Sequence, residues 1–121
     1  MYTEKKITGI GKSGEDFTAK WLRKNGCIVI KRNFSNRYGE IDIVAENDEY
    51  MLFVEVKTRI KDAMVSGAEA VDGYKINRIR NLANDFLNKF YTEKTPRFDV
   101  AEVTYEEDTE NFLMNYIENA F

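Results

Sequence analysis

Two segments near the middle of the chain alternate polar and apolar side chains. Residues 40–45 read EIDIVA, and residues 52–57 read LFVEVK. Alternation that is rich in Ile and Val is typical of a β-strand with one buried face. Asn47, Asp48 and Glu49 separate the two segments and favour a tight turn. The pattern therefore predicts a β-hairpin whose core face carries Ile41, Ile43, Ala45, Leu52, Val54 and Val56.

The turn also predicts which residues of this hairpin face each other. A turn centred on residues 48–49 places Asp42 opposite Glu55 and Glu40 opposite Lys57, all four on the polar face. Two carboxylates at about 5 Å repel each other by roughly 3 kcal/mol at an effective dielectric constant of about 20. We therefore expect a cation between Asp42 and Glu55. Mg²⁺ suits such a place because it takes a few carboxylates together with water.

Other segments carry helical or strand-like patterns. Ser13 has the form of an N-cap, Phe17, Trp21 and Leu22 form an apolar stripe, and Gly26 is suited to the end of a helix. The predicted order is a polar lead-in at 1–11, a helix at 13–25, a strand at 27–31, a connection at 33–38, the hairpin, a connection at 60–67, a long helix at 69–90, a break at 95–96, a strand at 97–105, an acidic turn at 106–108 and a last strand at 112–117.

This order predicts an α/β fold with a mixed central sheet flanked by helices. The step from Val56 through the long helix to Phe98 is expected to be a right-handed crossover. With 121 residues, the chain is expected to form one domain over residues 1–121.

Composition removes several classes of chemistry. The chain has no histidine, which excludes Ser-His-Asp and Cys-His catalysis and argues against a structural zinc site. Acid–base chemistry must then use Asp, Glu, Lys or Tyr. Cys27 is the single cysteine and is expected to be a buried thiol, which suits a reducing cytoplasm. We expect no signal peptide after Met1, and the longest apolar run, 50–54, is too short to cross a membrane.

Charge is unevenly distributed along the chain. The net charge is −3, but residues 1–84 carry 15 basic and 12 acidic residues, whereas residues 85–121 carry 3 and 9. A basic part of a chain can face a polyanion, although solvated surface is the commoner reason. Arg37, Lys75 and Arg78 are candidates for phosphate contacts on this basis. Glu15 has two interpretations, a carboxylate favoured by the helix dipole or a further acid directed at the metal site.

Several short motifs together carry a resemblance to a known family. Asp42, followed on the next strand by Glu55-Val56-Lys57, is similar to the signature of the PD-(D/E)XK nuclease superfamily, with Ile41 where that signature has proline. More closely, the chain resembles the YraN-like family of small bacterial proteins, which is considered distantly similar to archaeal Holliday-junction resolvases. The matching pieces, within roughly residues 10–105, are Gly14-Glu15 with Ala19 and Leu22, Arg32-Asn33, Gly39-Glu40-Ile41-Asp42, Glu55-Val56-Lys57-Thr58-Arg59, Glu69-Ala70-Val71 with Lys75, and Arg97-Phe98-Asp99-Val100.

The resemblance implies a restriction-endonuclease-like α-β-β-β-α-β core and a magnesium-dependent endonuclease that cuts DNA, with branched DNA among the candidate substrates. Asp42 and Glu55 would bind Mg²⁺ or Mn²⁺, Lys57 would hold the attacking water, and Glu15 would match a helix-borne acid of the resolvases. Arg37, Arg59, Lys75 and Arg78 would contact phosphates, and a homodimer is expected by analogy. The alternatives are an inactive nucleic-acid-binding module of the same fold and a structural or partner-binding protein.

Overall fold

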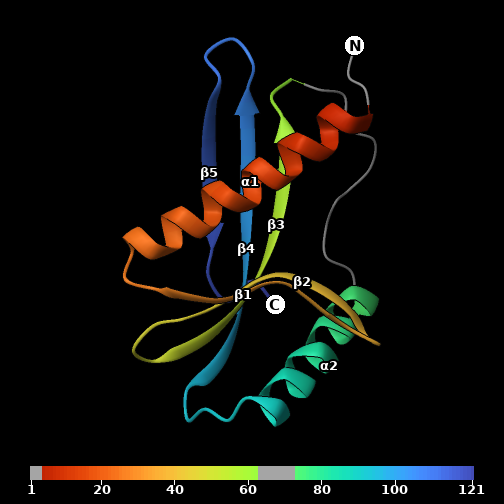
Figure 1. Cartoon of the computed structure of the whole chain (residues 1–121), viewed down its shortest axis with the longest axis vertical. Helices are drawn as coiled ribbons and strands as arrows, with labels where there is room; N and C mark the ends of the chain where they lie inside the picture. The colour runs from red at the N-terminus through yellow and green to blue at the C-terminus, as the bar shows by residue number, and fades with distance from the viewer. Residues whose placement is uncertain (1–3, 63–72) are drawn as a thin grey trace.

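The computed structural model describes residues 4–62 and 73–121, with the side chains of 11–62 and 75–121. The elements are α1 (Glu4–Lys24), β1 (Ile28–Asn36), β2 (Gly39–Glu46), β3 (Tyr50–Ile60), α2 (Gly73–Lys89), β4 (Thr95–Glu106) and β5 (Asn111–Ile117). The strands form one sheet in the order β1-β2-β3-β4-β5 (Figure 1). β3 and β4 are parallel, and the other neighbours are antiparallel. The predicted α/β fold with a mixed, helix-flanked sheet is confirmed.

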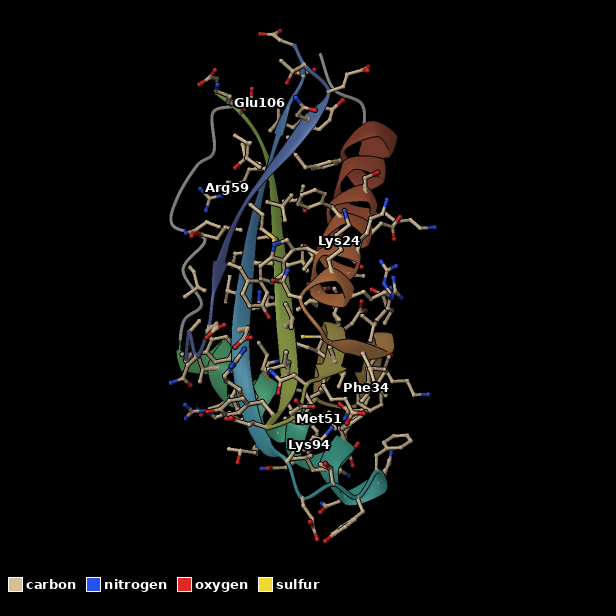
Figure 2. The ribbon with its side chains drawn as sticks, turned by 90° about the vertical axis from the view of Figure 1, so that its left-hand side faces the viewer. Lys24, Phe34, Met51, Arg59, Lys94 and Glu106 are labelled. Atoms are coloured by element: carbon tan, nitrogen blue, oxygen red, sulfur yellow. The ribbon has the colours of Figure 1, made fainter. Side chains whose placement is uncertain are left out.

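The two helices pack on opposite faces of the sheet and create two apolar clusters. α1 crosses β3 and β4 on one face, and α2 packs against β2 on the other (Figures 1 and 2). The buried residues of the first cluster are Ala19, Leu22, Ile43, Ala45, Leu52, Val54, Ala101 and Val103. Those of the second cluster are Ile41, Val44, Met51, Phe53, Ile79, Leu82, Ala83 and Phe86.

The prediction of one core face for the hairpin was therefore wrong. Val44 and Phe53 are as fully buried as Ile43 and Val54, because a central strand between two helices has two apolar surroundings. Ile41 also belongs to the α2 cluster and not to the cluster of Ile43. The polar face of the hairpin is consequently confined to its open end, around Asp42 and Glu55.

The predicted hairpin register is confirmed where β2 and β3 pair. Ile43 lies opposite Val54, and the pairing continues to Glu46 opposite Met51. The predicted turn closes through the Oδ1 atom of Asn47, which accepts hydrogen bonds from the backbone N–H of Glu49 at 2.9 Å and of Tyr50 at 2.7 Å. The side chain thus takes the role that turn-forming asparagines typically have.

The beginning of α1 differs from the expectation, and its end agrees with it. The helix begins at Glu4, so residues 4–11 are not a lead-in and Ser13 is not an N-cap. Glycines inside this segment each cost only about 1 kcal/mol, which does not stop a helix as proline would. At the other end, Gly26 has φ +84° and donates to the carbonyl of Arg23, and Cys27 donates to that of Leu22. This is the left-handed helix end that glycine favours.

Other predicted boundaries also shift. β1 continues to Asn36, where the sequence predicted a connection over 33–38, and Ile60 still belongs to β3. Pro96 lies in β4 instead of breaking the chain, because a proline near the start of a strand removes little of the ladder. α2 ends at Lys89, and the predicted helix start at Glu69 lies outside the described residues. The predicted acidic turn and last strand are confirmed.

In the part of the chain that the structure describes, no helix has an apolar stretch long enough to span a bilayer.

A buried carboxylate ties the C-terminal strands together. Asp99 is 0% exposed and accepts two hydrogen bonds from Arg97, at 3.0 and 2.9 Å. It also accepts one from the hydroxyl of Tyr116 at 2.6 Å and one from the backbone N–H of Asn119 at 2.9 Å. The guanidinium of Arg97 lies over the ring of Tyr50, 4.7 Å from its centroid. A buried charge is tolerated when its hydrogen bonds are satisfied, as they are here.

Replacing this carboxylate should therefore be costly. We expect Asp99→Asn to lower the free energy of unfolding by about 3 kcal/mol, because breaking the buried ion pair leaves Arg97 with the more distant and exposed Glu118 as its acidic neighbour. Glu102→Gln on the same strand is the matched control, because its bond to Asn115 is exposed and such changes cost less than about 0.5 kcal/mol. Urea unfolding of the parent and the two variants measures the change in the free energy of unfolding that each substitution causes. Equal decreases in the two variants would contradict the structural role of Asp99.

Candidate functional site

The site lies where β2 leaves β3. Pairing between the two strands ends at Ile43 and Val54, one residue before Asp42. Beyond this point the carboxylate of Asp42 connects the two strands, because its Oδ2 atom accepts a hydrogen bond from the backbone N–H of Val56 at 2.7 Å. A side chain thus replaces a rung of the ladder and turns the carboxylate of Asp42 toward β3. The open end of the hairpin therefore contains an acid anchored to the neighbouring strand.

The predicted proximity of Asp42 and Glu55 is visible in their electrostatics. Burial raises the pKa of Asp42 most, and the Glu55 carboxylate raises it further, to about 7. The hydrogen bond from Val56 lowers it, whereas Glu15 and Glu40 raise it slightly. Four carboxylates from three elements therefore act on one another at this end of the hairpin. At neutral pH, Asp42 is poised between its charged and neutral forms.

Glu15 reaches this region because α1 approaches β3 closely. A Cβ at Gly14 would overlap the side chain of Thr58, so only glycine allows this approach without a shift. Burial raises the pKa of Glu15, nearby Arg32 lowers it, and Glu40 raises it again. The structure thus places Glu15 beside the acids of the hairpin, as the second of its two interpretations requires.

Glu40 and Asn33 also lie at this site, although the sequence pattern predicted no site role for either of them. The amide nitrogen of Asn33, in the orientation that satisfies its hydrogen bonds, lies 3.1 Å from Oε1 of Glu40 and 3.1 Å from Oε1 of Glu15. Glu40 is therefore held toward β1, and the expectation that it faces Lys57 was wrong, because β2 has left β3 before this point. The available signal was the presence of Arg32-Asn33 and Gly39-Glu40 among the matching motifs.

The predicted cations lie in three places. Lys75 of α2 forms an ion pair with Glu55, its Nζ atom 2.9 Å from Oε1. Lys57 and Arg59 line a hollow over β4 and β5, and Arg59 lies on the side of the sheet away from α1 (Figure 2). Arg37 packs on the ring of the adjacent Tyr38 and donates to its hydroxyl at 2.9 Å.

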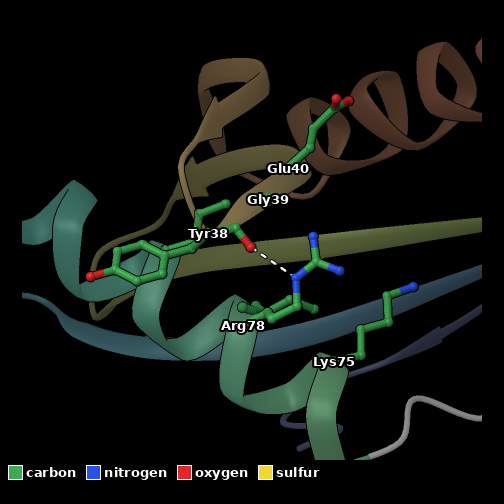
Figure 3. A pocket seen from close by; sticks show the side chains of 7 residues that line it. Tyr38, Gly39, Glu40, Lys75 and Arg78 are labelled. Atoms are coloured by element: carbon green, nitrogen blue, oxygen red, sulfur yellow. Dashed lines mark hydrogen bonds between the residues drawn. The ribbon is translucent and has the colours of Figure 1, made fainter.

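A pocket of about 360 Å³ adjoins the acids. Tyr38, Gly39, Glu40, Lys75 and Arg78 line it, together with apolar residues of α2, and both cations rise from α2 on the side of Glu40 (Figure 3). The Nε atom of Arg78 donates to the carbonyl of Tyr38 at 2.9 Å. Gly39 has φ +137°, and a Cβ there would meet the guanidinium of Arg78. Glycine at position 39 therefore leaves room for the guanidinium of Arg78 beside the carbonyl of Tyr38.

The donor set can be compared with the needs of a divalent ion. Among the described residues, no three His, Cys, Asp or Glu side chains are close enough to hold a metal by themselves. The pair Asp42 and Glu55 remains, and Mg²⁺ accepts a few carboxylates and fills its other positions with water or phosphate oxygens. Burial raises the pKa of Asp42 most, and the neighbouring carboxylate of Glu55 raises it further, so negative charge is unfavourable at this pair without a cation. A pair of this kind fits Mg²⁺ or Mn²⁺ better than an ion that needs a full protein cage.

The pKa of Asp42 makes stability depend on pH. Its folded pKa, about 7, exceeds its ordinary value of 3.8, so the folded protein binds the proton more tightly and loses stability as pH rises between these values. We expect Asp42→Asn to unfold with a free energy about 1–3 kcal/mol higher than the parent near pH 8, since one pKa unit is worth about 1.4 kcal/mol. Near pH 4 the two should be equal. Urea unfolding across this range tests it, and a mutant less stable at both pH values would contradict it.

The chain is similar in sequence to a family of known proteins. Residues 14–103 match the model of the uncharacterised protein family UPF0102. A UPF0102 protein from Clostridium perfringens is 40% identical over 114 residues, with 93% of each chain covered. One from Dictyoglomus turgidum is 40% identical over 113 residues, covering 93% of this chain and 96% of its own, and one from Syntrophomonas wolfei is 39% identical over 118 residues, with the same coverage. The chain therefore belongs to the family UPF0102.

Proposed function

We propose that the protein is a magnesium-dependent endonuclease that hydrolyses phosphodiester bonds in DNA. The observation that carries the proposal is the half-buried Asp42 carboxylate, which accepts a hydrogen bond from Val56 and lies close to the carboxylate of Glu55. The order of helices and strands and the motif Glu55-Val56-Lys57 support a place in the PD-(D/E)XK nuclease superfamily. Branched DNA is a candidate substrate, and a homodimer would present two sites to one junction.

In this proposal, Asp42 and Glu55 hold the divalent ion. When bound, the ion supplies positive charge to the scissile phosphate and the leaving oxygen. To hold the ion, Asp42 must be deprotonated, and Glu55 must give up its ion pair with Lys75. Lys57 lies two residues after Glu55 on β3, which puts both side chains on the same face of the strand, and acts as an electrostatic aid to the attacking water. Glu15 is the further acid contributed by α1.

The basic residues around the site would hold the DNA backbone. Lys75 and Arg78 border the pocket beside Glu40, and Arg59 lines the second hollow with Lys57. Arg37 adds a cation next to Tyr38, close in sequence to the same pocket. Contacts of this kind position a phosphate backbone without recognising base sequence. We therefore propose DNA binding that depends on shape and charge.

Two observations favour a second function, a nucleic-acid-binding module without activity. Glu55 is paired with Lys75 at 2.9 Å, and the pKa of Asp42, raised mainly by burial, leaves much of it protonated at neutral pH. Both features neutralise the acid pair in the absence of a metal. A protein of this kind would bind branched or single-stranded DNA equally well in Mg²⁺ and in EDTA and would not cut it.

Cleavage assays separate these two functions. We expect cleavage of at least one substrate in a panel of branched, linear and single-stranded DNA with Mg²⁺ or Mn²⁺ and none with EDTA. Asp42→Asn should abolish it by removing a metal ligand. Millimolar Mg²⁺ should raise the melting temperature of the parent and not of Asp42→Asn, because a ligand stabilises the state that binds it. Asp48→Asn is the control, an exposed acid in the turn at the other end of the same hairpin. If Mg²⁺ neither supports cleavage by the parent nor raises its melting temperature, the proposed nuclease function is ruled out.

Binding to DNA should depend on salt and on Arg78. Removing one cation that neutralises a phosphate lowers the slope of log affinity against log salt concentration by about one unit. We expect Arg78→Gln to have this effect and to weaken binding to all sequences alike. Lys89→Gln is the matched control, a cation of the same helix that pairs with Asp85 and is 60% exposed. Fluorescence anisotropy at several salt concentrations measures the slope, and equal effects of both variants would contradict a role for the pocket.

A further inference from the structure

Asn33 has an unusual backbone conformation for a residue inside a strand. Its φ is +52°, a left-handed value that asparagine adopts more readily than most residues with a side chain. Its neighbours Arg32 and Phe34 pair with Ile43 and Ile41 of β2, which puts Asn33 level with Asp42. A strained position of this kind persists when the surrounding structure holds it in place. The strain in β1 thus lies beside the site.

The side chain of Asn33 connects two other elements of the fold. In the amide orientation that satisfies its hydrogen bonds, its nitrogen lies 3.1 Å from an oxygen of Glu15 on α1 and 3.1 Å from an oxygen of Glu40 on β2. These carboxylates repel each other, as the rise that Glu40 causes in the pKa of Glu15 indicates. The two N–H groups of one neutral amide can donate to both acids at once. Asn33 therefore offsets the repulsion between these two acids of α1 and β2.

Arg32, the preceding residue, holds the same turn of α1. Its NH1 atom lies 2.7 Å from Oδ1 of Asp16, and its NH2 atom lies 3.9 Å from Oε1 of Glu15. Two successive residues of β1 thus fix two neighbouring carboxylates of the helix. Arg32 attracts Glu15 by charge, whereas Asn33 sets its position relative to Glu40 through directed hydrogen bonds.

We propose that Asn33 is a positioning residue of the acidic site, whose amide clamps Glu15 to Glu40 and holds the helix-borne acid beside Asp42 and Glu55. The clamp makes Glu40 a fourth member of the acid group, although it carries no assigned role in the motif. The effect on cleavage rests on the proposed nuclease function. The clamp itself is a property of the chain without metal or DNA and is tested separately.

Two substitutions distinguish the clamp from the backbone conformation. Glycine and aspartate both tolerate positive φ, so Asn33→Gly and Asn33→Asp each keep the fold of β1. Glycine removes the donor, whereas aspartate keeps the shape, removes the donor and adds a negative charge. Asn119→Gly is the matched control, an asparagine with φ +51° in the C-terminal tail. A purely conformational role predicts that all three variants behave like the parent.

The first measurement is steady-state cleavage of the best substrate from the panel. We expect Asn33→Gly to lower kcat about tenfold and Asn33→Asp about a hundredfold, with KM for DNA within about twofold, because a displaced acid impairs the reaction more than binding. Asn119→Gly should retain the parental kcat. Parental kcat in Asn33→Asp, or a loss confined to KM, would overturn the positioning role and leave the nuclease proposal standing.

The second measurement needs no activity. Urea midpoints of the metal-free parent, Asn33→Gly, Glu15→Gln and the double variant form a double-mutant cycle. We expect Asn33→Gly to lower the midpoint by a smaller amount in the Glu15→Gln background, because the repulsion that the amide offsets is gone. Asn119→Gly should lower it equally in both backgrounds. Coupling in a parent that cuts no DNA would support the clamp and refute the nuclease, whereas additive changes would overturn the clamp.

Discussion

The structure depends on how a group of like charges is held together at the open end of one hairpin. Asp42 is largely withdrawn from water and lies within the field of Glu55, and its pKa rises to about 7 as a result. This arrangement opposes folding in the absence of a cation. It persists because the same two strands are buried on both faces, against α1 and against α2. The apolar clusters fix the strands, and the strands fix the acids.

Three elements offset the crowding in different ways. β3 donates the backbone N–H of Val56 to Asp42, α2 brings the ammonium of Lys75 to Glu55, and β1 brings the amide of Asn33 to Glu15 and Glu40. These contacts do not remove the repulsion between the acids, since Glu55 still raises the pKa of Asp42 beyond the larger rise that burial causes. A site of this kind retains capacity for a further positive charge, which is the physical basis of the proposed metal dependence.

Asp99 provides the contrast within the same molecule. It is completely buried, yet it accepts hydrogen bonds from Arg97, Tyr116 and Asn119. Its partners match it in charge and number, and it joins β4 to β5 and the tail. Asp42 has a hydrogen bond from Val56 and an acid as its neighbour. The buried carboxylate of Asp99 thus stabilises the fold. The negative charge of Asp42 and Glu55 is only partly compensated by the neighbouring groups.

The sequence by itself determined the order of the elements, the register of the hairpin and the approach of Asp42 to Glu55, because alternation and turn chemistry are local properties of the chain. Only the tertiary structure decided that Ile41 and Val44 pack on α2, that β2 leaves β3 before Glu40, and that Lys75 reaches Glu55. The role of Asn33 also lay beyond the sequence. Its two carboxylate partners belong to α1 and β2, and such contacts follow from packing between elements, which no local pattern encodes.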